Sequence, residues 1–197
     1  MIPAGFVFLA LAFNVLGAGS YLYRLARREI QPHIVTWALW ALAPLVAFVA
    51  QLSEHIGVQS LITLFTGASP LVVVVMLIAR RQGAWGVTAC DLFCGALSVA
   101  GLIIWALTRH AAYAVLFAIA ADALAAVPTY RKAWRNPGSE SWFNFACLAV
   151  SALITLATIT TWSPAHYAFA AYLAVLGLSM TAVILLGNRR VAAGRRA

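Results

Sequence analysis

The stretch IAADALAAVPTYRKAWRNPGSESW, residues 119–142, decides how this chain can fold. It places a single carboxylate, Asp122, inside an apolar run and follows it with Pro128. The apolar run then ends in three basic residues, Arg131, Lys132 and Arg135. An ionisable side chain inside a bilayer costs roughly 2.5–3.5 kcal/mol on insertion scales, so one that persists there usually faces a partner or a water-filled cavity. The stretch therefore predicts a membrane-spanning helix with a functional carboxylate near its middle.

The composition of the whole chain supports this interpretation. The 197 residues are 64% hydrophobic and 9% charged, with a mean hydropathy of +0.93. Soluble domains carry about 25% charged residues, so this composition is typical of an integral membrane protein. The net charge of +8 does not indicate a nucleic-acid partner, because every basic residue except Arg109 falls in alternate connections between apolar segments. We expect the partners to be the lipid bilayer and a small polar solute or a proton, with no cofactor; a homo-oligomer is left open.

Breaks at polar and basic residues divide the chain into seven apolar segments of the length that a helix needs to cross a bilayer. They are 2–23, 34–51, 58–79, 90–107, 111–130, 142–162 and 166–186. All seven should be helices, because backbone groups in lipid must be satisfied internally. Basic connections remain on the cytoplasmic side, which places the N-terminus outside and the C-terminus in the cytoplasm. We expect residues 2–23 to be a span and not a removed signal peptide, and we expect the bacterial inner (plasma) membrane as the location.

The first three segments are weakly similar to the last three. Asn14 corresponds to Asp122 at an offset of 108 residues, and the pair Thr36-Trp37 corresponds to Ser141-Trp142 at an offset of 105. The segments 67–69 and 177–179 correspond at an offset of 110. An odd number of spans precedes the second triplet, so the two triplets are parallel repeats. The predicted organisation is a repeat at 1–80, a linker helix at 81–110, a second repeat at 111–188 and a basic cytoplasmic tail at 189–197.

At these residues the chain resembles the PQ-loop superfamily, which includes the SWEET sugar transporters and lysosomal exporters of cystine and cationic amino acids. The resemblance is carried by Pro128-Thr129, by the following segment 130–132 and by Ser139-Glu140-Ser141. It implies three helices, a linker helix and three helices, with alternating access between them. Ser69 and Ser179 stand near the places where SWEET proteins have a pair of asparagines. Asp122 is similar in placement to aspartates that carry protons in the cystine branch.

The candidate solute and proton site consists of Asp122, Asn14, Trp40, Ser69 and Ser179. Burial disfavours the charged form of a carboxylate, so Asp122 could alternate between a neutral and a charged form, or bind a cationic solute. Its alternative role is an interhelical hydrogen bond to Asn14 that packs the two halves. Trp40 lies one turn deeper than Trp37, which we assign with Trp142, Trp105 and Trp162 to the aromatic belt at the membrane interfaces.

Three prolines are candidate hinges, because a proline inside a helix removes one backbone hydrogen bond and permits a kink. They are Pro128, Pro44 and Pro70. Asp91 is the candidate gate, where it could pair with Arg80 or Arg131; its alternative role is to cap the fourth helix.

The sequence favours a small-solute secondary transporter and leaves proton coupling open. The alternative is a seven-helix sensor or assembly partner that does not transport. We do not expect an enzyme, because the sequence has no paired carboxylates, no nucleophile elbow and no pair of metal ligands on one helix. No metal site is expected from the histidines of the outer connections, His55, His110 and His166.

Overall fold

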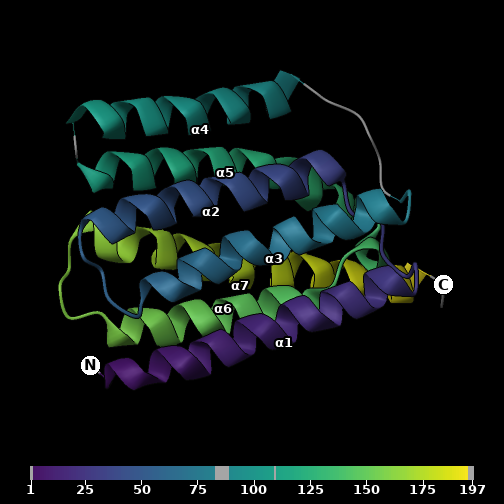
Figure 1. The fold of residues 1–197 in the computed structure, drawn as a ribbon. Helices are drawn as coiled ribbons and strands as arrows, with labels where there is room; N and C mark the ends of the chain where they lie inside the picture. The colour runs from purple at the N-terminus through teal and green to yellow at the C-terminus, as the bar shows by residue number, and fades with distance from the viewer. Residues whose placement is uncertain (1, 83–88, 109, 195–197) are drawn as a thin grey trace.

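The computed structural model describes residues 2–82, 89–108 and 110–194, apart from some side chains of the fourth helix and that of residue 194. In these ranges the chain forms α-helices and two short 3-10 helices, and no β-strand (Figure 1). The elements are η1 (Ala4–Phe6), α1 (Val7–Ala26), α2 (Ile34–Ser53), α3 (Ser60–Ala79), α4 (Ala89–Thr108), α5 (Ala111–Arg135), η2 (Pro137–Ser139), α6 (Trp142–Thr158) and α7 (Pro164–Gly194).

Five stretches of helix in the described ranges are long and apolar enough to cross a membrane. They are Ala4–Ala26, Ile34–Ser53, Ser60–Ala79, Ala111–Arg135 and Pro164–Ala193, and α6 is a shorter apolar helix. The mean hydropathy over their best windows is between 1.7 and 2.4, and most of those windows face outward from the protein interior. Outward-facing apolar helices of this length are those of an integral membrane protein, because in water they would form large exposed apolar patches.

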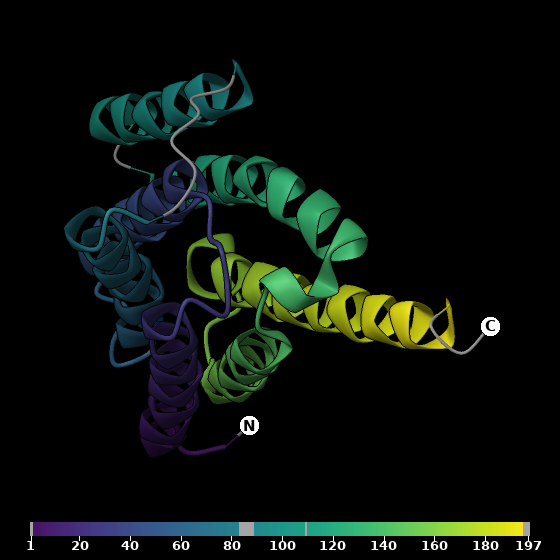
Figure 2. The ribbon, with the colours of Figure 1, turned by 90° about the vertical axis from the view of Figure 1, so that its right-hand side faces the viewer.

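Six of the helices form a closed ring around a common centre (Figure 2). Each helix contacts the next in the order α1, α3, α2, α5, α7, α6 and back to α1. The helix α4 lies outside this ring, against α5 and α2. The basic residues that end α1, α3, α5 and α7 gather at the end of the ring where the chain terminates, which we call the basic end (Figure 1).

The C-terminal ends of α5 and α7 lie five residues or more beyond the predicted ones. The helix α5 continues past Tyr130 to Arg135, so Pro128 and the basic segment after it lie inside a helix and not at its end. The helix α7 likewise continues past residue 186 through Arg189 and Arg190 to Gly194. Lysine, arginine and alanine are good helix formers, so helical structure outlasts the apolar run on which the prediction was based.

Two glycines allow neighbouring helices in the ring to approach closely. A Cβ atom on Gly67 of α3 would lie 2.8 Å from the Cγ atom of Leu45 and 3.1 Å from the carbonyl oxygen of Ala41, both in α2. A Cβ atom on Gly177 of α7 would lie 2.7 Å from the carbonyl oxygen of Phe145 in α6. Small residues at such crossings are how membrane helices gain van der Waals contact.

Candidate functional site

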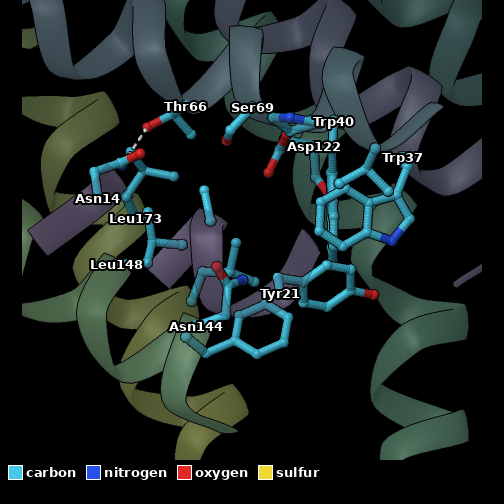
Figure 3. Close-up of a pocket in the computed structure, with 15 residues that line it drawn as sticks. Asn14, Tyr21, Trp37, Trp40, Thr66, Ser69, Asp122, Asn144, Leu148 and Leu173 are labelled. Atoms are coloured by element: carbon cyan, nitrogen blue, oxygen red, sulfur yellow. Dashed lines mark hydrogen bonds between the residues drawn. The ribbon is translucent and has the colours of Figure 1, made fainter. Parts of the chain in front are cut away.

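A cavity lies at the centre of the helix ring and is lined by all six helices of that ring (Figure 3). The space that the centres of water molecules can reach inside it has a volume of about 60 Å³. This is room for roughly five waters. The wall is mostly apolar, with a few polar groups on different helices. The lining residues are Asn14, Ala18, Tyr21, Trp37, Trp40, Thr66, Ser69, Pro70, Val73, Asp122, Asn144, Phe145, Leu148, Leu173 and Leu176.

Asp122 supplies the carboxylate of this cavity. Its side chain is 3% exposed, and Figure 3 shows it pointing from α5 into the space between the helices. Its Oδ2 atom accepts a hydrogen bond of 2.6 Å from the hydroxyl of Tyr172 on α7. Its other oxygen, Oδ1, has no hydrogen-bond donor among the described side chains, so this atom is left to interact with whatever occupies the cavity.

Asn14 and Ser69 line the same cavity from α1 and α3. The Nδ2 atom of Asn14 donates to the Oγ1 atom of Thr66 at 3.4 Å (Figure 3). The structure thus pairs Asn14 with Thr66 and Asp122 with Tyr172, and the direct hydrogen bond between Asn14 and Asp122 that the sequence left open is not formed. Both polar groups therefore remain on the cavity wall.

Four aromatic rings form the wall of the cavity toward its basic end. The ring centroids of Tyr21 and Trp37 are 4.4 Å apart, those of Trp37 and Trp40 are 5.4 Å apart, and those of Trp40 and Phe145 are 6.2 Å apart. The indole N–H of Trp40 donates to the backbone carbonyl of Asp122 at 3.3 Å, which positions this ring beside the carboxylate. The assignment of Trp37 to the aromatic belt is wrong, because the side chain is buried and packs on Tyr21 inside the ring of helices.

Beyond the aromatic rings, a buried carboxylate closes the basic end of the cavity. The side chain of Glu140, in the connection before α6, is 1% exposed; it pairs with the Nζ atom of Lys132 at 2.5 Å and accepts a hydrogen bond from Tyr21 at 3.1 Å. Arg24 donates to the backbone carbonyl of Glu140, and Lys132 donates to that of Gln31. Burial raises the pKa of the Glu140 carboxyl, and the ammonium of Lys132 opposes this shift.

Neutral amides close the opposite end. The Nε2 atom of Gln51 in α2 donates to the carbonyl of Ala165 in α7 at 3.2 Å. The Nε2 atom of Gln59 donates to the carbonyl of Thr158 in α6 at 3.4 Å. Each bond joins the first three helices to the last three, as the Glu140 contacts do at the basic end. Tertiary contacts therefore join the two triplets of helices at both ends of the central cavity.

The other predicted site residues lie elsewhere. Ser179 is on α7 but outside the cavity, where its hydroxyl contacts that of Tyr130 at 2.5 Å. Among the candidate hinges, Pro70 lines the cavity, whereas Pro44 and Pro128 lie inside α2 and α5 without lining it. The side chain of Asp91, the candidate gate, lies outside the described part of α4.

Three polar contributors were missed in the sequence. Tyr172 resembles any aromatic residue of an apolar span, so its hydroxyl gave no signal. In the sequence Glu140 looks like a solvated loop residue. It follows Lys132 by eight residues, however, and this short separation could have suggested an ion pair. Asn144 could have been found by the rule that singled out Asn14, because it is a lone amide near the start of an apolar segment.

Comparison of the chain with protein-family models, curated proteins and solved structures finds no match. The function is therefore argued from the chemistry and geometry of the site itself.

Proposed function

We propose that the protein is a secondary transporter for a small solute, of a PQ-loop or SWEET-like type, that works by alternating access around the central cavity and is coupled to protons. The observation that carries this proposal is the position of Asp122. Its carboxylate is buried, lies on the cavity wall and is only half satisfied by Tyr172. A buried charge without a full set of partners is costly, so its presence in a cavity favours a functional role over packing.

The contacts at both ends of the cavity support the same proposal. A binding site for a drug-sized ligand usually has a volume of roughly 300–1,000 Å³, much more than a space for about five waters. In this proposal the structure corresponds to a state of the cycle in which the contacts at both ends are formed and the space for the solute is small. The Glu140 contacts would open in the state that faces the basic end, and the Gln51 and Gln59 contacts in the state that faces the opposite end.

The proposed parallel repeat has support from the helix packing. In the ring, α1 contacts α6 and α5 contacts α2, as a twofold relation between α1–α3 and α5–α7 requires. The close approaches at Gly67 and Gly177 correspond as well, because each glycine lies against a carbonyl of the second helix of its own triplet. Those carbonyls belong to Ala41 and Phe145, which are 104 residues apart, close to the offset of 105 between Thr36-Trp37 and Ser141-Trp142. Two similar triplets that face one cavity are the arrangement that lets a carrier open to either side.

In this proposal all seven helices cross the membrane, with the N-terminus outside and the basic end in the cytoplasm. Pro70 lies at the cavity and interrupts the hydrogen-bond ladder of α3 there, while Pro44 and Pro128 do so in α2 and α5. These prolines are the proposed hinges. Asp122 would be neutral in one access state and charged in the other, which couples solute movement to a proton.

Cysteine accessibility tests whether the cavity opens to both sides. In a background in which Cys90, Cys94 and Cys147 are replaced by alanine, Ser69→Cys should react with a small membrane-impermeant thiol reagent added to either face of proteoliposomes. Ser151→Cys is the matched control, because Ser151 is fully buried in α6 away from the cavity and should not react. Reaction from one face only would favour a sensor with a fixed conformation, and reaction from neither face would contradict the transporter proposal.

Uptake driven by a pH gradient tests the role of Asp122. Proteoliposomes with wild-type protein and with Asp122→Asn are compared for solute accumulation with and without the gradient. The variant retains an oxygen that can accept from Tyr172 but cannot exchange a proton. Equal pH-driven accumulation by both proteins would eliminate the proposed coupling.

A further inference from the structure

We infer that the solute bound in the central cavity is a compact organic monocation, of the guanidinium or small alkylammonium class, and that it binds at Asp122 in competition with a proton. This inference rests on the proposed function, because it names the solute of the same site. It is carried by three features of the cavity: its charge, its aromatic wall and its size.

The charge of the cavity favours a cation. Among the fifteen described residues that line it, Asp122 is the one charged residue and none is basic. The described arginines and Lys132 lie at the basic end, beyond the aromatic rings. An anion would meet an uncompensated carboxylate, whereas a monocation would neutralise it and could donate a hydrogen bond to Oδ1. A neutral solute with several hydroxyl groups would find too few hydrogen-bond partners, because most of the wall is apolar.

The aromatic wall suits an organic cation better than a hydrated metal ion. Trp40 lies beside the carboxylate through its bond to the Asp122 carbonyl, and Trp37, Tyr21 and Phe145 continue the aromatic surface. Aromatic faces attract ammonium and guanidinium groups, and tryptophan does so most strongly. A metal ion would instead need several oxygen or nitrogen ligands, and the described residues contain no group of three or more His, Cys, Asp or Glu side chains that could hold one.

The size of the cavity limits the occupant. Space for roughly five waters corresponds to a molecule of about five non-hydrogen atoms. Guanidinium, methylammonium and tetramethylammonium fall within this limit. A planar guanidinium can also donate two parallel hydrogen bonds to a carboxylate while it stacks on an aromatic ring.

The same geometry makes the proton and the cation exclude each other. The titratable groups that face the Asp122 carboxylate are Tyr172 from α7 and Tyr21, which lines the cavity from α1. The lining residues of α2, α3 and α6 contribute none, and no described side chain of α4 lines the cavity. With a single carboxylate, the site holds either one proton or one monocation. Binding of the cation to the protonated protein must therefore release one proton.

Binding of guanidinium and urea to the detergent-purified protein tests the inference, because the two molecules have nearly the same shape and differ in charge. Calorimetry at millimolar concentrations should show at least tenfold tighter binding of guanidinium than of urea. Affinity for guanidinium should rise with pH by up to about tenfold per unit, the slope for exchange of one proton. A pH-indicator dye in weak buffer should report up to one proton released per cation bound.

Variants separate the carboxylate from the aromatic wall. Asp122→Asn should reduce guanidinium binding to the level of urea, whereas Glu54→Gln, which removes an exposed carboxylate at the end of α2, should leave it unchanged. Trp40→Leu should weaken guanidinium binding by about twofold to thirtyfold, and Trp40→Phe should restore part of the loss. If Asp122→Asn does not fold, the two Trp40 variants and the pH dependence of guanidinium binding to the wild-type protein still test the inference.

The outcomes distinguish this inference from the transporter proposal. Equal binding of urea and guanidinium, guanidinium binding that survives Asp122→Asn, or no binding of guanidinium would each overturn the cation site. Solute uptake that is driven by a pH gradient and needs Asp122 would then still uphold the carrier. Conversely, guanidinium binding with proton release in detergent but no guanidinium–proton exchange in proteoliposomes would uphold the cation site and refute the carrier.

Discussion

Removing Lys132 should destabilise the protein more than removing Glu140, and the difference should depend on pH. The two groups form one ion pair but differ in their access to water. The side chain of Lys132 is 28% exposed, whereas that of Glu140 is 1% exposed. In Glu140→Gln the ammonium can return to water and still donate to the carbonyl of Gln31, so the expected cost is about 1–2 kcal/mol.

In Lys132→Met the carboxylate remains buried with Tyr21 as its side-chain donor. It must then stay charged with Arg24 as the remaining nearby cation or take up a proton, and protonation sets the upper limit of the cost. A carboxyl whose ordinary pKa is 4.5 requires about 3.5 kcal/mol to be neutral at about pH 7 and less than about 1 kcal/mol at about pH 5. Because the folded pKa lies above the unfolded value, the folded variant holds its proton more tightly and loses stability as the pH rises.

The assay is unfolding of the detergent-solubilised protein at about pH 5 and about pH 7, for wild type, both single variants and the double variant. We expect Lys132→Met to cost about 2.5 kcal/mol more at the higher pH, and the double variant to recover most of that loss. The double variant is the control, since it contains neither charge. Equal destabilisation by the two single variants at about pH 7, or no dependence of the Lys132→Met cost on pH, would refute the reasoning.

Further predictions concern helix packing and the amide contacts at the end opposite the basic end, and thermal unfolding in detergent checks both. Gly177→Ala should destabilise by about 1–3 kcal/mol because its Cβ would meet the Phe145 carbonyl, whereas Gly19→Ala, with nothing within 4 Å, should be neutral or slightly stabilising. Gln51→Met should change stability by less than about 1 kcal/mol, because it loses the bond to Ala165 but also removes a buried Oε1 atom that has no partner among the described residues. Gln51→Glu should cost more, since it buries a charge.

The helices could be predicted from the sequence because membrane helices need apolar runs of a definite length. Each of the seven predicted segments overlaps one of the helices α1–α7 over most of its length. The ends of α5 and α7 could not be predicted in this way. Beyond the apolar run, the hydrophobic pattern no longer indicates where the helix ends. Residues such as Lys132 and Arg189 are compatible with a loop or a helix.

The candidate site shows which signals survive in an apolar sequence. Asp122 and Asn14 stand out because polar side chains in apolar runs are rare, and the structure places both on one cavity wall. Trp37 and Tyr172 do not stand out, because aromatic residues are common at membrane interfaces. A buried tyrosine is distinguished from these only by its hydrogen-bond partners, which the sequence does not show. Ser179 was chosen by its correspondence with Ser69, but a position on the same face of two helices does not ensure that both side chains reach one cavity.

The burial of Asp122 also explains how the proposed carrier would avoid leaking. To pass from one access state to the other, the ring of helices must close around a cavity that holds only about five waters. With an empty site and an ionised carboxylate, closure would bury a charge whose only side-chain donor among the described residues is Tyr172, which is costly. A proton or a monocation on Asp122 removes that cost. Closure is therefore favoured in the two loaded forms and disfavoured in the empty charged form, which is the condition for obligatory exchange of a proton for a cation.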